Sequence, residues 1–97
     1  MGGKRVVLDV GDWQPIRDIK DTFIQALRWI SVSQHNKGTG PPLLFVEVFK
    51  AESREDNGTY YQLDLTAKDR LVTKKYQAII LETVEGLDLK SFTPLGH

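Results

Sequence analysis

The 97 residues carry thirteen basic and thirteen acidic side chains, so the chain lacks the net positive charge that would attract nucleic acid. Hydrophobic residues make up 40 % of the sequence and charged residues 27 %, a composition typical of a globular domain and not of a disordered or membrane-spanning chain. The absence of cysteine excludes disulfides, thiolate nucleophiles and most structural zinc sites. We therefore expect one domain over residues 1–97, without metal or cofactor, that binds neither nucleic acid nor membrane.

The N-terminal segment predicts a loose trunk followed by a short edge strand. Residues 1–10 are expected to form a flexible trunk. Because no apolar segment follows the basic pair Lys4-Arg5, we expect no signal peptide, and the compartment, secreted or cytoplasmic, stays open. The stretch Trp13-Gln14-Pro15-Ile16 favours an edge strand, since proline cannot donate a hydrogen bond within a central ladder.

One helix is predicted from Asp21 to about Lys37. The Asp21 carboxylate can accept hydrogen bonds from the amides of the first turn, and Gly38 with the prolines that follow prevents continuation. Apolar residues then recur at spacings of three and four, which predicts a stripe that faces the core. The stripe comprises Phe23, Ala26, Leu27, Ile30 and Gln34, whereas Gln25, Arg28 and Ser33 should face water, and Trp13 and Trp29 should be packing residues.

Beyond residue 42 the hydrophobic period changes from 3.6 to 2, which predicts sequential antiparallel strands. The turn Asp56-Asn57-Gly58 supplies residues that tolerate positive φ, and Lys68-Asp69-Arg70 and Glu85-Gly86 mark two further reversals. The pattern predicts an α+β fold in which one α-helix packs on an antiparallel β-sheet of four to five strands. The four clearest strands are Leu43–Ala51, Thr59–Ala67, Val72–Glu82 and Leu87–Phe92.

Several motifs in one order resemble the plant cystatins. The helix carries Leu27-Arg28-Trp29-Ile30-Ser31-Val32-Ser33-Gln34-His35-Asn36, which is similar to that family's helix signature. Gly11-Asp12-Trp13-Gln14-Pro15-Ile16 is similar to its Gly-Gly-Trp-x-Pro-Ile opening, and Gly58-Thr59-Tyr60-Tyr61-Gln62-Leu63 to its Gly-Thr-x-Tyr-x-Leu strand. Lys75-Tyr76-Gln77-Ala78-Ile79-Ile80 and Ser91-Phe92-Thr93-Pro94 match its ending, so the resemblance runs from Gly11 to Pro94.

The resemblance implies a cystatin-like fold and reversible inhibition of papain-like cysteine proteases, without any chemistry of the chain's own. In that family a wedge made of an N-terminal segment and two hairpin loops fills the substrate cleft of the protease. We therefore expect a protein that is not an enzyme and whose partner is a papain-like protease. The residues that would bind the protease are Gly11, Asp12, Arg54, Glu55, Asp56, Asn57, Gly58, Thr83, Val84 and Glu85.

The sequence departs from the family where the wedge should be. The family motif Gln-x-Val-x-Gly corresponds to 54–58, where only Gly58 is retained, and the second hairpin lacks Pro-Trp. Asp12 replaces the second glycine of the trunk. Because a wedge should carry few unpaired charges when water is expelled, we expect inhibition to be weakened or re-targeted.

Other interpretations of the same residues stay open. The altered loops could serve a non-inhibitory binding or structural module, either a natural paralogue or an engineered scaffold. The only residues that would support a hydrolase are Ser31, Ser33 and His35, and their spacing on a helix supplies no third group to orient the histidine. Asn57-Gly58-Thr59 is a glycosylation sequon that matters only if the chain is secreted. We expect a monomer that could form a domain-swapped dimer, and solvated carboxylates at Glu55, Asp56, Asp64 and Asp69.

Overall fold

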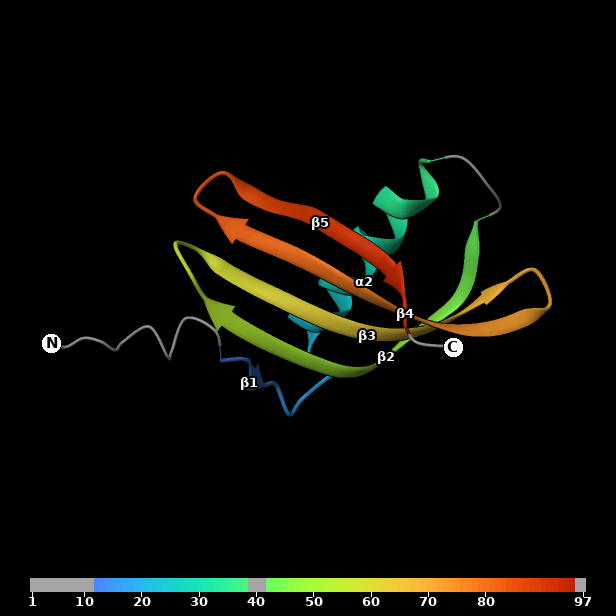
Figure 1. Cartoon of the computed structure of the whole chain (residues 1–97), viewed down its shortest axis with the longest axis horizontal. Coiled ribbons are helices and arrows are strands. Elements are labelled where there is room, and N and C mark those ends of the chain that lie inside the picture. Colours follow the sequence, from blue (N-terminus) through green and yellow to red (C-terminus); the bar gives the residue numbers. More distant parts are fainter. Residues whose placement is uncertain (1–11, 39–41, 96–97) are drawn as a thin grey trace, which may run out of the picture.

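The computed structural model describes residues 12–38 and 42–95, in which one helix lies against a single antiparallel sheet (Figure 1). Predictions for residues 1–11, including the flexible trunk, and for 39–41 fall outside the described part. The five described strands follow one another in space in chain order, β1-β2-β3-β4-β5. The elements are β1 Gln14–Pro15, α2 Thr22–Asn36, β2 Leu43–Glu55, β3 Thr59–Asp69, β4 Val72–Thr83 and β5 Gly86–Pro94.

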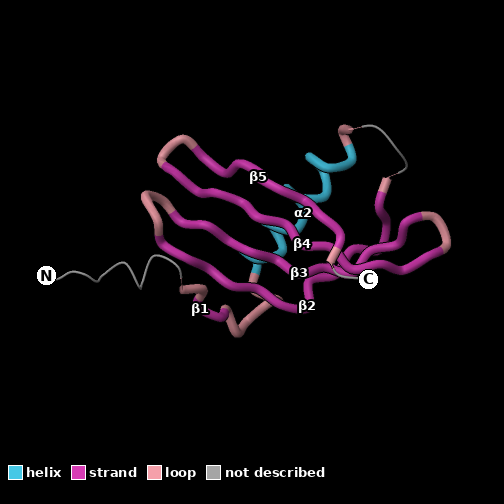
Figure 2. Tube along the Cα trace, in the orientation of Figure 1, coloured by secondary structure: helices cyan, strands magenta, loops and turns pink. Residues whose placement is uncertain are grey.

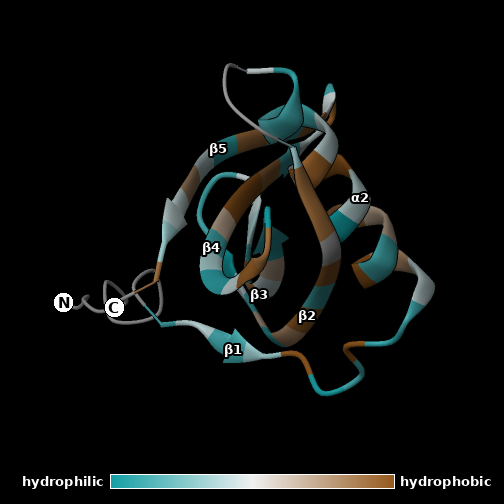
Figure 3. Cartoon of the chain, turned by 90° about the vertical axis from the view of Figure 1, so that its right-hand side faces the viewer, coloured by the Kyte–Doolittle hydropathy of each residue, from teal (hydrophilic) through white to brown (hydrophobic). Residues whose placement is uncertain are grey.

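The α+β fold class is confirmed. Strands β2 to β5 are longer than predicted, whereas the edge strand expected over Trp13–Ile16 is shorter, since β1 contains only Gln14 and Pro15. β2 continues through the polar stretch after Ala51 to Glu55, because β3 pairs with it on one side and β1 on the other. Two register shifts in β2, between Leu44 and Glu47 and between Val48 and Lys50, interrupt its ladder with β3. Such irregularities increase local bending, and the sheet curves around the helix, as Figure 3 shows.

Both ends of α2 are fixed by side chains, and the sequence pattern indicated the first of them, Asp21. The Asp21 carboxylate accepts a hydrogen bond from the Phe23 amide at 3.0 Å, which confirms the predicted cap. At the other end, the Asn36 amide side chain accepts from Leu43 N at 3.0 Å and donates to Leu43 O at 3.4 Å, joining the helix to the start of β2. Within the described residues, no helix is long and apolar enough to cross a bilayer.

The core face of α2 was predicted wrongly: the buried face is rotated about the helix axis relative to the predicted stripe. Ile24, Leu27 and Ser31 are the buried residues of the helix, whereas Phe23 is 36 % exposed. Burying Ser31 leaves no donor unpaired, because its hydroxyl donates to Leu27 O at 2.8 Å. The three residues expected to face water, Gln25, Arg28 and Ser33, are all half-buried. Gln25 donates to Ile19 O, Arg28 donates to Gln25 and to Val46 O, and Ser33 donates to Trp29 O.

The main core lies between α2 and the inner face of the sheet. Leu63 and Leu65 of β3 belong to this core and are fully buried. On its outward side the prediction of a solvated Asp64 is wrong, since this residue is only 9 % exposed and accepts a hydrogen bond from Gln77. Trp29 was expected to pack, but 67 % of it is exposed because it lies on the helix side facing away from Ile24, Leu27 and Ser31.

Candidate functional site

Three chain segments converge at one end of the sheet. The β2–β3 and β4–β5 turns lie at the same end (Figure 2), and β1 pairs with β2 near it, with Gln14 opposite Ser53 and Pro15 opposite Glu52. This antiparallel pairing places Asp12 and Trp13 beside the end of β2. We call this end the loop edge, defined as Asp12, the β2–β3 turn 55–58 and the β4–β5 turn 83–86. The predicted site residue Gly11 lies outside the described residues.

The β2–β3 turn is held in a narrow geometry by its backbone. Asn57 has φ 58° and Gly58 φ 131°, which confirms the predicted use of residues that tolerate positive φ. The Asp56 amide donates to Gly58 O at 2.9 Å across the turn. A Cβ placed on Gly58 would lie 2.9 Å from Glu82 O on β4, so this turn approaches its neighbouring strand closely. Gly58 therefore fixes the position of the first turn against β4.

The β4–β5 turn is less tightly held. Gly86 has φ 127°, but no heavy atom lies within 4 Å of a Cβ placed there. The Glu85 amide donates to the Thr83 hydroxyl at 3.2 Å, and the Val84 side chain between them is fully exposed. The second turn therefore offers one exposed apolar residue, Val84, to a partner.

The loop edge carries mostly acidic groups that are exposed. Glu55 is exposed and accepts a hydrogen bond from the Thr59 hydroxyl at 2.9 Å, and Asp56 lies 3.9 Å from the Arg54 guanidinium. Farther along β5, Lys90 pairs with Asp88 at 2.9 Å, and this hydrogen bond raises the pKa of Lys90. A partner that covers the turns must therefore remove water from several carboxylates.

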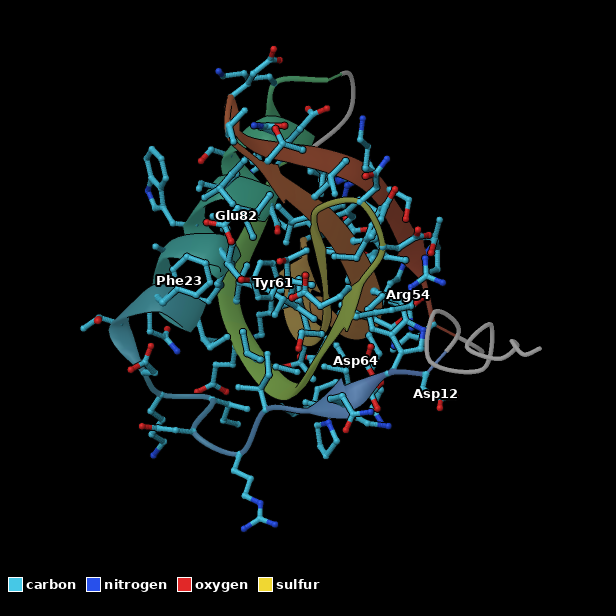
Figure 4. The ribbon with its side chains drawn as sticks, turned by 90° about the vertical axis from the view of Figure 1, so that its left-hand side faces the viewer. Asp12, Phe23, Arg54, Tyr61, Asp64 and Glu82 are labelled. Atoms are coloured by element: carbon cyan, nitrogen blue, oxygen red, sulfur yellow. The ribbon has the colours of Figure 1, made fainter. Side chains whose placement is uncertain are left out.

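Behind the turns, on the helix side of the sheet, Tyr61 links β3 to β4. Its hydroxyl donates to Glu82 at 2.9 Å, and its ring meets Phe23 of α2 edge-on at 5.2 Å (Figure 4). Burial, and then the hydrogen bond to Glu82, raise the pKa of Tyr61 from 10.0 to about 12. This cluster connects the start of the helix to the base of the loop edge.

On the other side of the sheet, Arg54 lies between two aromatic rings. Its guanidinium carbon is 5.2 Å from the centroid of Trp13 and 5.2 Å from that of Tyr60. Arg54 was predicted as a site residue, but these ring contacts were not predicted. The pairing of the two strands could have indicated the contact with Tyr60, because Arg54 and Tyr60 are direct cross-strand partners.

The residues considered for catalysis do not form a site. The Ser31 hydroxyl donates to Leu27 O, and the Ser33 hydroxyl donates to Trp29 O. His35, in the last turn of α2, stacks on Phe92 at 4.2 Å between ring centroids. No member of this set activates another.

The carboxylates considered together are separated in the structure. Asp64 lies in the middle of β3, and Asp69 lies at the end of that strand, where it pairs with Lys74 at 3.2 Å. Glu55 and Asp56 belong to the loop edge. In the described residues, 12–38 and 42–95, no group of three potential ligands could hold a metal ion.

Comparison with known proteins assigns the chain to a family. The model of a family described as "Aspartic acid proteinase inhibitor" matches residues 16–95. "Cysteine proteinase inhibitor 1" of Actinidia chinensis var. chinensis is 31% identical over 80 residues, covering 82% of this chain and 68% of that protein. "Cysteine proteinase inhibitor 5" of Arabidopsis thaliana is 33% identical over 91 residues, covering 91% and 75%, and "Cysteine proteinase inhibitor 8" of Oryza sativa subsp. japonica is 33% identical over 88 residues, covering 88% and 72%.

These matches agree with the geometry of the chain. The family model covers the helix and nearly the whole described sheet, and the three relatives each align over more than four fifths of the chain. The resemblance noted in the sequence is thus confirmed at the level of the family, and the hydrolase interpretation is wrong because family and relatives are inhibitors. The chain belongs to the plant cystatin-like family of proteinase inhibitors and is not an enzyme.

Proposed function

We propose that this chain is a reversible inhibitor of papain-like cysteine proteases that docks through the loop edge and binds more weakly than a family member with complete loop motifs. The observation that carries the proposal is the convergence of Asp12 and the two turns at one end of the sheet. A substrate cleft accepts a narrow wedge, and two adjacent hairpin turns with a neighbouring chain segment have that shape. The names of the three curated relatives favour this class of target.

The residues of the turns support the weakened binding. Where the family motif has valine, Asp56 would enter the cleft, and the second turn offers Val84 in place of Pro-Trp. The loss of a buried aromatic anchor costs about 2–4 kcal/mol of affinity. Desolvating the Glu55-Asp56 pair costs about 1–3 kcal/mol more. Because each 1.4 kcal/mol corresponds to about a tenfold change in Kd, the two effects together raise Kd by several powers of ten.

A second candidate target is an aspartic protease, which the description of the matching family favours. Aspartic proteases use a carboxylate pair that shares one proton at acid pH, so this target has to be tested under acidic conditions.

An inhibition panel separates the two targets. The purified chain is titrated against papain at pH 6.5 and against pepsin at pH 3, with chymotrypsin as the control for unspecific inhibition. We expect micromolar or weaker inhibition of papain. Stronger inhibition of pepsin than of papain would favour the second target. No inhibition of either enzyme at 100 µM chain would reject both and favour the non-inhibitory binding module.

Two designed variants test the weakened wedge directly. Glu55→Gln with Asp56→Asn removes charge at nearly constant shape and should tighten papain binding by about tenfold or more. Asp56→Val, combined with Pro-Trp inserted after Val84, restores family loop residues and should give a larger gain. The matched control, Arg70→Gln with Thr73→Val, changes the hairpin at the opposite end of the sheet and should leave inhibition unchanged.

The proposal fails if the restored loops bring no gain while the variants remain folded by circular dichroism. Inhibition that appears only after restoration, with none in the original chain, would show that the scaffold is competent and that this chain uses its loops for another partner. Thr83 and Glu85 were also predicted as site residues, and they stay part of the proposal because they lie in the second turn.

A further inference from the structure

Arg54 lies at the point where the first hairpin meets the segment before β1. We propose that Arg54 is a positioning residue of the inhibitor: its guanidinium joins Trp13 to Tyr60, so that Asp12 and the first turn reach the target in one fixed arrangement. The inference rests on the proposed docking role of the loop edge. It concerns a residue that stands where the family motif has glutamine.

The geometry of three neighbouring strands places the guanidinium between the rings. Arg54 on β2 is directly opposite Tyr60 on β3, and Trp13 immediately precedes Gln14 of β1, whose partner is Ser53 of β2. Both ring centroids lie 5.2 Å from the guanidinium carbon, within the distance of about 6 Å at which a cation is attracted to a ring face. A planar guanidinium can stack on such faces, which an ammonium group cannot do.

The polar contacts of Arg54 are weaker than its contacts with the two rings. Its Nε is buried and has no hydrogen-bond partner among the described residues, and its ion pair with Asp56 is long at 3.9 Å. A buried N–H without an acceptor is unfavourable, so hydrogen bonding does not explain the place of this side chain. The two ring contacts are the interactions that hold it there.

The side chain acts through its neighbours more than by direct contact with a target. Only 25 % of the Arg54 side chain is exposed, so little of it can touch a docked protein. In contrast, β1 contains just Gln14 and Pro15, and so short a terminal strand opens readily when nothing else anchors it. Without the bridge through Trp13, the described residues Asp12 and Trp13 would have to be ordered at the moment of binding, which lowers affinity.

The first experiment measures the bridge without any protease. The chain has two tryptophans, so Trp29→Phe leaves Trp13 as the only indole reporter. In this background, Arg54→Met should raise acrylamide quenching of Trp13 by about twofold, because the ring loses its partner and becomes mobile. Arg54→Lys, which keeps the charge without the planar group, should give an intermediate rise. Arg17→Met, at an exposed arginine nearby, is the matched control and should change nothing.

The second experiment links the bridge to inhibition, using whichever protease the panel identifies. Arg54→Met should weaken binding about tenfold, mainly through faster dissociation. In a double-mutant cycle with Trp13→Leu, the two effects should be clearly non-additive, because each substitution removes the same contact. A role of Arg54 confined to the hairpin would give additive effects.

The outcomes of the two experiments are distinguishable. Unchanged quenching in folded Arg54→Met and Arg54→Lys chains, or additive effects in the cycle, would overturn the positioning role. If quenching rises as expected while the original chain inhibits no protease, the bridge between Trp13 and Arg54 stands and the proposed docking function fails.

Discussion

The helix–sheet core and the loop edge of this inhibitor are held in place by different forces. In the core, Ile24 and Leu27 of α2 are buried against Leu63, Leu65 and their neighbours, so its stability follows from apolar area removed from water. At the loop edge most turn residues are exposed, and the geometry depends on positive φ angles and a few hydrogen bonds. Stability and binding should therefore be separable by substitution, which the following predictions test.

The largest effect on stability is expected from Leu27→Ala. Leu27 is fully buried, so its truncation leaves a cavity between α2 and the sheet and should cost about 2–5 kcal/mol of the free energy of unfolding. Urea denaturation measures this loss. The inhibition constant, corrected for the fraction of folded chain, should not change, because Leu27 does not contact the loop edge. A matching loss of affinity would mean that the core also sets the shape of the docking site.

Gly58→Ala should affect both properties. The substitution places a Cβ 2.9 Å from Glu82 O at a φ of 131°, so we expect a loss of about 2–3 kcal/mol in the free energy of unfolding and weaker inhibition, as the turn shifts away from β4. Gly86→Ala is the matched control, because its φ of 127° is equally unusual but no atom lies nearby. It should cost only about 1–2 kcal/mol. Equal losses would remove the close approach as the cause.

The sequence predicted the parts of this molecule that depend on local pattern. The capping of α2 by Asp21 and the positive φ angles of Asn57 and Gly58 each depend on a few neighbouring residues, and both were confirmed. The core face of α2 was predicted wrongly, because Phe23 and Ile24 are neighbours that satisfy helical spacing equally well, and only packing against the sheet selects Ile24.

Contacts between residues far apart in the sequence could not be predicted, because they depend on which strands pair. The polar run after Ala51 resembles a loop, yet it is a strand because β1 and β3 supply hydrogen-bonding partners on both sides. The contact of Arg54 with Trp13 spans much of the chain and depends on that pairing. The proposed site residues come from the family resemblance, whereas their mutual arrangement required the fold.

Tyr61→Phe should produce a smaller effect that depends on pH. Below pH 10 the loss of the hydrogen bond to Glu82 should cost about 1 kcal/mol. The folded state holds the Tyr61 proton more tightly than the unfolded state, since its pKa is raised from 10.0 to about 12. The original chain should therefore lose this stabilisation as the pH rises from 10 to 12, while Tyr61→Phe loses less. Parallel pH profiles of unfolding in the two chains would contradict the assignment.

The smallest effect on stability, and the sharpest separation of the two regions, should come from two exposed ion pairs. Lys90 pairs with Asp88 near the loop edge, and Lys74 pairs with Asp69 at the opposite hairpin, so Lys90→Gln and Lys74→Gln remove equivalent contacts at opposite ends of the sheet. Such pairs contribute little to folding, and neither variant should change urea denaturation measurably.

Binding should distinguish the two variants. Lys90→Gln leaves Asp88 uncompensated beside the docked target and should change the association rate in a manner that salt suppresses, whereas Lys74→Gln should not. The sign is informative: faster association indicates a basic rim on the protease cleft, and slower association an acidic one. Equal association rates for both variants and the original chain would mean that the target does not face this end of the sheet. The loop edge would then not be the docking site.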